Sequence, residues 1–265
     1  MTKLEQLKEW FSDKKSVIIA LSGGVDSALV AYCAHSSLGD AALAVTADYK
    51  TLAQEELESA KKICQEIGMR HLIIEYDELQ NEDFVKNDPN RCFHCRTELS
   101  DHLNEIAKKQ NISIIVDGTN LDDLGEYRPG ILALKNNGIR SPLVEVGLTK
   151  QEVRDAAKAS GLSVFDRPSN ACLASRIPWG QRVTAERLAR IEVGETFVKQ
   201  ISGAKQVRVR DINGAAKIEV GADELGLLQK TKIEELVEKL KSIGFDSVTI
   251  DKDGYKPGKL NVIAD

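Results

Sequence analysis

No stretch of this 265-residue chain is apolar over the length of a membrane span. Residues 1–6 begin a charged amphipathic segment where a secretory signal would place an apolar one. Positive charge is not in excess, because the formal net charge is -5 at pH 7. Such a balance disfavours a surface for non-specific nucleic-acid binding, although it leaves room for a local basic patch. We therefore expect a cytoplasmic protein with no membrane partner, and we consider nucleic acid an unfavoured partner.

The chain lacks the spacings G-x-x-x-x-G-K and G-x-G-x-x-G at its glycine-rich turn, which argues against Walker NTPases and Rossmann dinucleotide binders. The turn at Ser22–Ser27 instead reads Ser-Gly-Gly-Val-Asp-Ser, between an apolar run at 16–21 and a helical pattern at 28–32. A strand that leads through glycines into a helix start points several N–H groups at one spot, where the helix dipole adds positive potential. This turn therefore predicts an anion site.

Five cysteines make an odd count, and only one pair has C-x-x-C spacing, so one chain cannot build a closed four-cysteine zinc site. Cys33 and Cys64 fall within apolar helical patterns, which predict buried structural thiols. Cys92 and Cys95 form the pair, and Cys172 lies far along the chain among arginines in an irregular, proline-containing segment. Three thiolates can hold a [4Fe-4S] cluster with one iron free, or a zinc ion with a water, and the pair alone could be a redox dithiol.

Strand patterns alternate with helix patterns over the first 160 residues, which predicts an α/β fold, a parallel sheet with helices on both faces. In such sheets, ligands bind beyond the carboxyl ends of the strands, so 22–27, 46–49 and 117–120 should share one rim. The expected strands are 16–21, 41–46, 71–76, 112–116 and 142–146. The expected helices are 3–12, 51–67 and 99–109, together with one that begins near residue 28 and one that begins at the capping-box pattern of 149–152.

The pattern changes beyond residue 161, and we expect three parts: an α/β domain at 1–162, an irregular connection at 163–183 that carries Cys172 and Arg176, and a smaller α+β domain at 184–265. In the last part, Thr184 should cap a helix to about residue 201. Asn213 and Gly214 should turn a hairpin of 206–210 with 216–220, followed by helical segments within 223–243 and a strand at 247–250.

The hexapeptide Ser22–Ser27 resembles the pyrophosphate-binding loop of the PP-loop ATP pyrophosphatases, which adenylate a substrate and release pyrophosphate. Further segments are similar to the LarE-type ATP-dependent sulfur transferases of nickel-pincer nucleotide cofactor synthesis. They are Asp117–Asp123, the segment 127–130 that starts at Tyr127, Ser141–Leu143, Cys172–Pro178, Val207–Arg210 and Ala216–Glu219. The likeness extends from about Ser16 to Ile250.

This resemblance implies an ATP pyrophosphatase-like α/β domain with a small C-terminal domain, assembled as a homohexamer. It implies the substrate pyridinium-3,5-biscarboxylic acid mononucleotide, whose carboxylates become thiocarboxylates after adenylation by ATP with Mg2+. Carried over by position, the implied pyrophosphate site comprises Ser22, Gly23, Gly24, Asp26 and Ser27. Gly118 and Thr119 would lie near the nucleotide. The implied contacts with the substrate or its phosphate are Ser175, Arg176, Glu195 and Arg208.

Members of the resembled family differ in their sulfur source. Some surrender the sulfur of the cysteine at the position of Cys172 and end as dehydroalanine, whereas others carry three cysteines that hold an iron-sulfur cluster. With Cys92 and Cys95 beside Cys172, this chain resembles the cluster-bearing kind. The sacrificial reaction at Cys172, a PP-loop tRNA thiolase and a non-catalytic nucleotide- or metal-binding regulator remain the alternatives.

Overall fold

The computed structural model describes residues 1–125, 128–229 and 233–256, and the chain divides into two units. The first unit comprises Met1–Tyr76 and Cys92–Asn170, and the second comprises Asp77–Arg91 and the chain from Ala171 onward. Tyr127 of the motif at 127–130 lies outside the described residues, as do residues 230–232 of the expected helical segment 223–243.

A four-stranded parallel sheet forms the centre of the first unit, as the sequence predicts. Its spatial order is β3-β2-β1-β4. Because β1 lies between β2 and β4, the residues that follow β1 and β4 emerge side by side at the carboxyl edge. The strands are β1 (Val17–Ala20), β2 (Ala42–Asp48), β3 (Arg70–Glu75) and β4 (Ile115–Val116).

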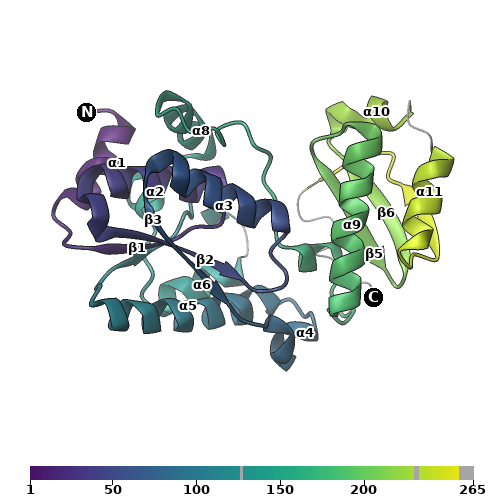
Figure 1. The fold of residues 1–265 in the computed structure, drawn as a ribbon, viewed down its shortest axis with the longest axis horizontal. Coiled ribbons are helices and arrows are strands. Elements are labelled where there is room, and N and C mark those ends of the chain that lie inside the picture. The colour runs from purple at the N-terminus through teal and green to yellow at the C-terminus, as the bar shows by residue number, and fades with distance from the viewer. Residues whose placement is uncertain (126–127, 230–232, 257–265) are drawn as a thin grey trace. The chain divides into compact units, whose positions relative to one another are not determined.

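Helices cover both faces of this sheet (Figure 1). One face packs against α1, α2, α3, α7 and α8, where residues such as Phe11, Leu29 and Ile63 are fully buried. The other face packs against α5 and α6 through Leu103 and Leu134. The helices are α1 (Lys3–Ser12), α2 (Val25–Leu38), α3 (Gln54–Ile67), α5 (Arg91–Gln110), α6 (Pro129–Asn136), α7 (Pro142–Val146) and α8 (Lys150–Ala159).

The expected strand at 142–146 is wrong, because these residues form the short helix α7. Pro142 occupies the first helical turn, where its fixed φ suits a helix and its missing N–H costs nothing. Gly147 ends the helix in the left-handed conformation, with φ of 74°. A five-residue apolar run cannot distinguish strand from helix by its period, so the flanking Pro and Gly carried the better signal.

Helix α5 begins eight residues before the expected start at residue 99, so it carries Cys92 and Cys95 in its first turns. The side chain of Asp88 accepts a hydrogen bond from the Asn90 N–H at 2.7 Å, and the Asp88 carbonyl accepts from the Arg91 N–H at 3.0 Å. This Asx turn directs the chain into the helix directly after Pro89. The two cysteines, three residues apart, therefore lie on one helix face.

In the second unit, α9 (Ala185–Ser202) and α11 (Ile233–Ser242) pack against a three-stranded mixed sheet of order β5-β6-β7 (Figure 1). The predicted hairpin is confirmed: β5 (Val207–Ile212) and β6 (Ala215–Val220) pair antiparallel around Asn213 and Gly214. The predicted last strand is also found, and β7 (Ser247–Ile250) pairs parallel with β6. Short helices α4 (Glu82–Val85) and α10 (Leu225–Gln229) complete the unit. No helix in the described part of the chain is long and apolar enough to cross a membrane.

Residues 77–91 join the second unit through the fully buried Asn87, a connection that the sequence did not indicate. The Asn87 side-chain amide donates to the carbonyls of Pro178 and Gln181, each at 2.8 Å. Arg91 donates to the Asn87 side-chain oxygen at 2.7 Å and to the Ala174 carbonyl at 2.9 Å. These bonds hold the segment around Ala174, next to Cys172, in a defined conformation.

Candidate functional site

The Ser22–Ser27 loop joins β1 to α2, as predicted. The side chains of Ser22 and Ser27 stabilise its conformation by hydrogen bonds within the loop. The Ser27 hydroxyl donates to the Gly24 carbonyl at 3.2 Å. Its oxygen therefore accepts from the Ser22 N–H at 3.2 Å and from the Ser22 hydroxyl at 3.1 Å. Gly24 caps α2, whose first N–H groups have no partner within the helix. The loop thus presents backbone donors and a dipole to one point.

Two glycines make this loop possible because backbone from other segments lies against them. Gly23 has φ of +81°, and a Cβ there would lie 2.4 Å from the Glu56 carbonyl oxygen. A Cβ on Gly118, which follows β4, would lie 2.6 Å from the Ser27 nitrogen. Gly118 therefore lies directly against the start of α2, so the structure brings the two predicted parts of the nucleotide site together.

Asp26, in the first turn of α2, is held by two side chains from beyond β4. The Asn120 side-chain amide donates to Asp26 Oδ1 at 3.1 Å. Lys150, the first residue of α8, forms an ion pair with the other carboxylate oxygen. The Lys150 N–H donates to Asp122 Oδ2 at 2.8 Å, which fixes the start of α8 beside this rim. Lys150 was missed from the sequence, since its capping box located α8 but gave no link to Asp26.

Thr119 lies at the same rim and donates to the carboxylate of Asp117, which also accepts from the Ser141 hydroxyl at 2.7 Å. Asp117 is buried, and this burial raises its pKa while the two hydroxyls partly offset the rise. Thr119 is thus oriented by a buried acid, and its neighbour Gly118 contacts the loop.

The five cysteines fall into two groups. Cys33 and Cys64 are buried in the core, as predicted, and burial raises the pKa of each thiol to about 12, so neither is a ready thiolate. On α5, Cys92 is exposed and Cys95 is buried, and both belong to the first unit. Cys172 is half-buried and belongs to the second unit. Within the described residues, no three His, Cys, Asp or Glu side chains form a ready metal site.

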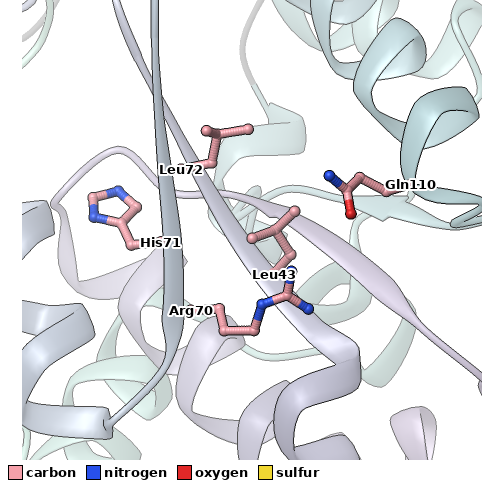
Figure 2. A pocket seen from close by; sticks show the side chains of 5 residues that line it. All are labelled: Leu43, Arg70, His71, Leu72 and Gln110. Carbon is pink, nitrogen blue, oxygen red and sulfur yellow. The ribbon is translucent and has the colours of Figure 1, made fainter.

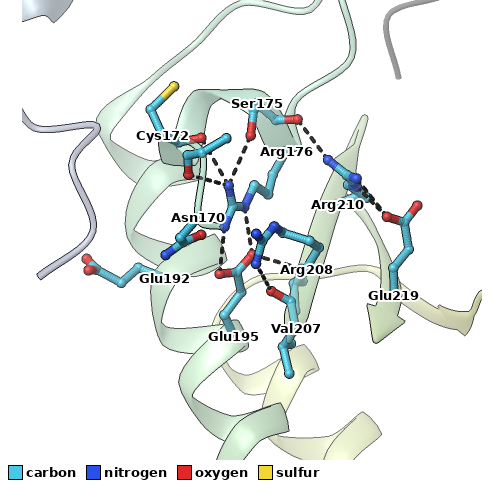
Figure 3. A network of polar contacts seen from close by, with 12 residues as sticks. Asn170, Cys172, Ser175, Arg176, Glu192, Glu195, Val207, Arg208, Arg210 and Glu219 are labelled. Atoms are coloured by element: carbon cyan, nitrogen blue, oxygen red, sulfur yellow. Dashed lines mark hydrogen bonds and ion pairs between the residues drawn. The ribbon is translucent and has the colours of Figure 1, made fainter. Parts of the chain in front are cut away.

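In the second unit, the 3-10 turn η4 (Leu173–Arg176) places Arg176 inside the unit, where its side chain is fully buried (Figure 3). Its guanidinium donates to both carboxylate oxygens of Glu195 on α9, at 2.7 and 3.1 Å. It also donates to the carbonyls of Ala171 and Cys172 and to the Ser175 hydroxyl, at 2.6, 3.1 and 3.0 Å. Arg176 therefore orders the chain that carries Cys172.

Two more buried arginines project from β5 beside this pair (Figure 3). Arg208 donates to the Val207 carbonyl at 2.7 Å, and Arg210 donates to Glu219 at 2.7 and 2.9 Å and to the Ser175 carbonyl at 2.9 Å. The guanidinium groups of Arg208 and Arg210 lie 5.0 and 5.8 Å from the ring centre of Tyr255.

The charges of this arginine cluster, Arg176, Arg208 and Arg210 with Glu195 and Glu219, are strongly coupled. Burial alone would raise the pKa of Glu195, but the ion pair with Arg176 outweighs it and lowers that pKa. Burial and the neighbouring Arg176 lower the pKa of Arg208. An added anion would relieve this repulsion between arginines, as a phosphate does.

The structure thus brings Ser175, Arg176, Glu195 and Arg208 together in one unit, where the last three are buried. Arg210 and Glu219 are further members that were not among the predicted site residues. A signal was present: in the predicted hairpin, Glu219 pairs in register with Arg208, and Arg210 lies two residues further along the same strand face.

A pocket of about 370 Å³ lies elsewhere in the first unit, lined by Leu43, Arg70, His71, Leu72 and Gln110 (Figure 2). Its strand residues lie at the beginnings of β2 and β3, whereas ligands of parallel sheets bind beyond the strand ends. None of the predicted site residues lines it, and it is not the candidate site.

Comparisons with known proteins identify the family of the chain. A family model described as "Queuosine biosynthesis protein QueC" matches residues 16–88, which include the Ser22–Ser27 loop. The pyridinium-3,5-bisthiocarboxylic acid mononucleotide synthase of Lactiplantibacillus plantarum is 30% identical over 98% of this chain and 94% of that protein. The protein slr1717 of Synechocystis sp. is 41% identical over 98% of this chain and 97% of its own length. The tRNA-specific 2-thiouridylase MnmA of Rickettsia africae is 26% identical, over 60% of this chain and 53% of that enzyme.

Proposed function

Because the chain belongs to the LarE family of ATP-dependent sulfurtransferases, we propose that it converts carboxylates of pyridinium-3,5-biscarboxylic acid mononucleotide into thiocarboxylates for nickel-pincer cofactor synthesis. The acceptor is taken from the relative that is matched over nearly its full length. The tRNA thiouridylase shares only about half of its length with this chain, so it supports the ATP chemistry but not a tRNA acceptor.

The observation that carries the proposal is the Ser22–Ser27 loop, with Gly118 against it and Asp26 held by Lys150. Its N–H groups suit the pyrophosphate part of ATP, which leaves when the substrate carboxylate attacks the α-phosphorus. Mg2+ would accompany ATP and neutralise phosphate charge when bound. Asp26 and Lys150 supply one negative and one positive group beside that position.

The arginine cluster of the second unit is the proposed binding site for the substrate phosphate. Guanidinium groups bind phosphate oxygens in pairs, and a buried cluster loses less of that interaction to solvent. Arg176 is already held by Glu195 and two carbonyls, so its part is to orient the loop of Ser175 and Cys172. Arg208 is the residue that we assign to the phosphate itself.

The proposed reaction has two steps. A carboxylate is a poor electrophile, so its oxygen first attacks ATP to form an acyl adenylate and release pyrophosphate. A sulfur nucleophile then attacks the acyl carbon and displaces AMP, which carries away one oxygen of the substrate. The product keeps the carbon skeleton and has sulfur in place of that oxygen.

Cys92, Cys95 and Cys172 are the proposed ligands of a [4Fe-4S] cluster. Their chemistry suits it: three thiols are left after the two inert core cysteines, and Cys92 and Cys95 lie three residues apart on one helix. When bound, such a cluster would supply one iron without a protein ligand, able to hold sulfide.

The cluster assignment is tested by anaerobic purification with iron and acid-labile sulfide analysis. We expect iron and sulfide in the wild type and their loss in each of Cys92→Ala, Cys95→Ala and Cys172→Ala, with Cys33→Ala unchanged. If Cys172→Ala alone abolishes sulfur transfer, and turnover leaves dehydroalanine at Cys172, the sacrificial reaction is correct instead.

We also propose, as the resemblance implies, that the protein acts in the cytoplasm as a homohexamer. Light scattering coupled to size-exclusion chromatography gives the assembly directly. A single 29.1 kDa species would contradict the hexamer.

The function itself is tested by pyrophosphate release with ATP, Mg2+ and the pyridinium dicarboxylate mononucleotide. We expect release only when the mononucleotide is present, and none from Asp26→Ala or Ser27→Ala, because both side chains shape the loop and neither is in the hydrophobic core. Circular dichroism controls for folding. Normal release from a folded Asp26→Ala variant would reject the adenylation assignment.

A further inference from the structure

The carbonyl of Gly23 is held by two side chains on the side of the loop that faces α3. The Ser59 hydroxyl of α3 donates to it at 2.8 Å, and Arg167 Nη1 donates to it at 3.1 Å. Arg167 comes from the segment after α8, far along the chain from the loop. A neutral carbonyl oxygen thus has both a hydroxyl and a guanidinium donor.

Arg167 is itself fixed by Glu56 at the start of α3. Its two terminal nitrogens donate to both carboxylate oxygens of Glu56, at 2.9 and 2.6 Å, and one also donates to the Glu55 carbonyl at 3.2 Å. The Glu56 residue is 5% exposed, so removing the arginine would leave a buried carboxylate with less compensation. Asn170 adds hydrogen bonds to both Glu55 and Glu56 at 2.9 and 3.0 Å.

This arrangement fixes a peptide plane of the phosphate loop. In a trans peptide the carbonyl of Gly23 and the N–H of Gly24 point in opposite directions. With the carbonyl held toward α3, the Gly24 N–H points away from α3. Gly23 has φ of +81°, so without these donors the flexible glycine pair has other accessible peptide orientations.

We propose that Arg167, held by Glu56, is a positioning residue that presents the Gly24 N–H to the pyrophosphate part of ATP. This inference rests on the proposed function, which it deepens by adding a residue that touches no reacting atom. Preorganised N–H donors bind an anion better than donors that must first rotate into place. A purely structural ion pair would instead affect every ligand of the unit alike.

The test is a calorimetric titration of the full chain with two separate probes, inorganic pyrophosphate and AMP, each with Mg2+. For Arg167→Ala we expect pyrophosphate affinity to fall about tenfold, the factor that matches one hydrogen bond of ~1.4 kcal/mol. AMP affinity should stay within about twofold, because AMP has no pyrophosphate group to accept a hydrogen bond from the Gly24 N–H. Arg182→Ala, which breaks an exposed arginine-carboxylate pair with Glu82, is the matched control and should change neither.

Two further variants separate positioning from folding. Glu56→Ala should weaken pyrophosphate binding as Arg167→Ala does, and the double variant should be no worse than either, because both act through one contact. Ser59→Ala removes the other donor to the Gly23 carbonyl without breaking the ion pair, and it should also weaken pyrophosphate binding selectively.

Unchanged pyrophosphate affinity in folded Arg167→Ala, or an equal loss for AMP, would overturn the inference. If Arg167→Ala does not fold, unchanged pyrophosphate affinity in Ser59→Ala would overturn it. A wild type that binds no pyrophosphate would overturn the proposed function and the inference together, whereas tight wild-type binding with an unaffected Arg167→Ala overturns the inference alone.

Discussion

At the scale of single residues, the proposed nucleotide site contains a charge pair that connects two distant segments. Asp26 belongs to the loop after β1, and Lys150 begins α8. Both side chains are partly exposed, so the pair contributes little to folding and both groups remain able to bind ligands. We therefore expect Lys150 to exchange Asp26 for a phosphate oxygen when ATP binds.

We predict that Lys150→Ala raises the KM for ATP about tenfold, the loss of one charge-assisted contact, with the unfolding midpoint almost unchanged. Steady-state pyrophosphate release over a range of ATP concentrations measures it. Lys109→Ala, an exposed lysine on α5, is the control. An unaltered KM for ATP would show that Lys150 only balances the charge of Asp26.

Arg208 gives the corresponding prediction for the substrate. Arg208→Ala should raise the KM for the mononucleotide by at least about tenfold and leave that for ATP within about twofold, because its guanidinium belongs to the arginine cluster that we propose binds the substrate phosphate. Arg208→Lys keeps the charge and should recover part of the loss. Equal increases for both substrates would place Arg208 in the fold or in the ATP site.

Much of the site at this scale follows from the sequence. The order of Ser, Gly, Asp and Ser between a strand and a helix predicts an anion-binding loop, because the conformation of this loop depends mainly on residues that are adjacent in the sequence. The partners of Asp26 and of the Gly23 carbonyl do not follow, because Lys150 and Arg167 reach them only through the packing of α8 and the segment after it. No local rule links residues more than a hundred positions apart.

At the scale of secondary-structure elements, the residues that begin or end a helix predicted its type and bounds better than runs of apolar residues did. Thr149 and Glu152 form the predicted capping box of α8, and Thr184 caps α9. The apolar run at 142–146 wrongly predicted a strand, because its proline and glycine boundaries mark a helix. The early start of α5 was also missed, since it depends on the Asx turn of Asp88.

We predict that Thr149→Ala lowers the free energy of unfolding by about 1 kcal/mol, the usual loss of an N-cap. Thr149→Ser keeps the hydroxyl and should stay close to the wild type. Because Lys150 is the next residue, Thr149→Ala should also weaken ATP binding. Urea unfolding followed by circular dichroism measures the first effect, and wild-type stability in Thr149→Ala would contradict it.

At the scale of the whole molecule, the chain is two units, and their stabilities should respond differently to acid. In the second unit, burial would raise the pKa of Glu195 and Asp211, but ion pairs with arginines lower both pKa values below their ordinary 4.5 and 3.8. In the first unit, burial raises the pKa of Glu56 and Asp117. A carboxylate whose pKa is lowered by folding stabilises the folded state at pH values above its ordinary pKa. This stabilisation is lost as the pH falls through the pKa that the group has in the folded protein.

The second unit should therefore lose stability as the pH is lowered from about 5 toward 3, because its unfolded carboxylates take up protons first. Its single tryptophan, Trp179, reports on it in a Trp10→Phe variant. We expect the midpoint of thermal unfolding to fall over this pH range. In Glu195→Gln, the midpoint should depend less steeply on pH. A midpoint that rises on acidification would contradict the buried ion pairs.

In the proposed reaction, a substrate carboxylate is adenylated before sulfur enters. The most direct measurement uses a mononucleotide with heavy oxygen in its carboxylates, incubated with ATP, Mg2+ and sulfide and followed by mass spectrometry. Because the carboxylate oxygen bridges to the α-phosphorus, each AMP should carry one heavy oxygen, and the product should contain sulfur in place of that oxygen. Formation of ADP, or unlabelled AMP beside a sulfur-free mononucleotide, would contradict the account.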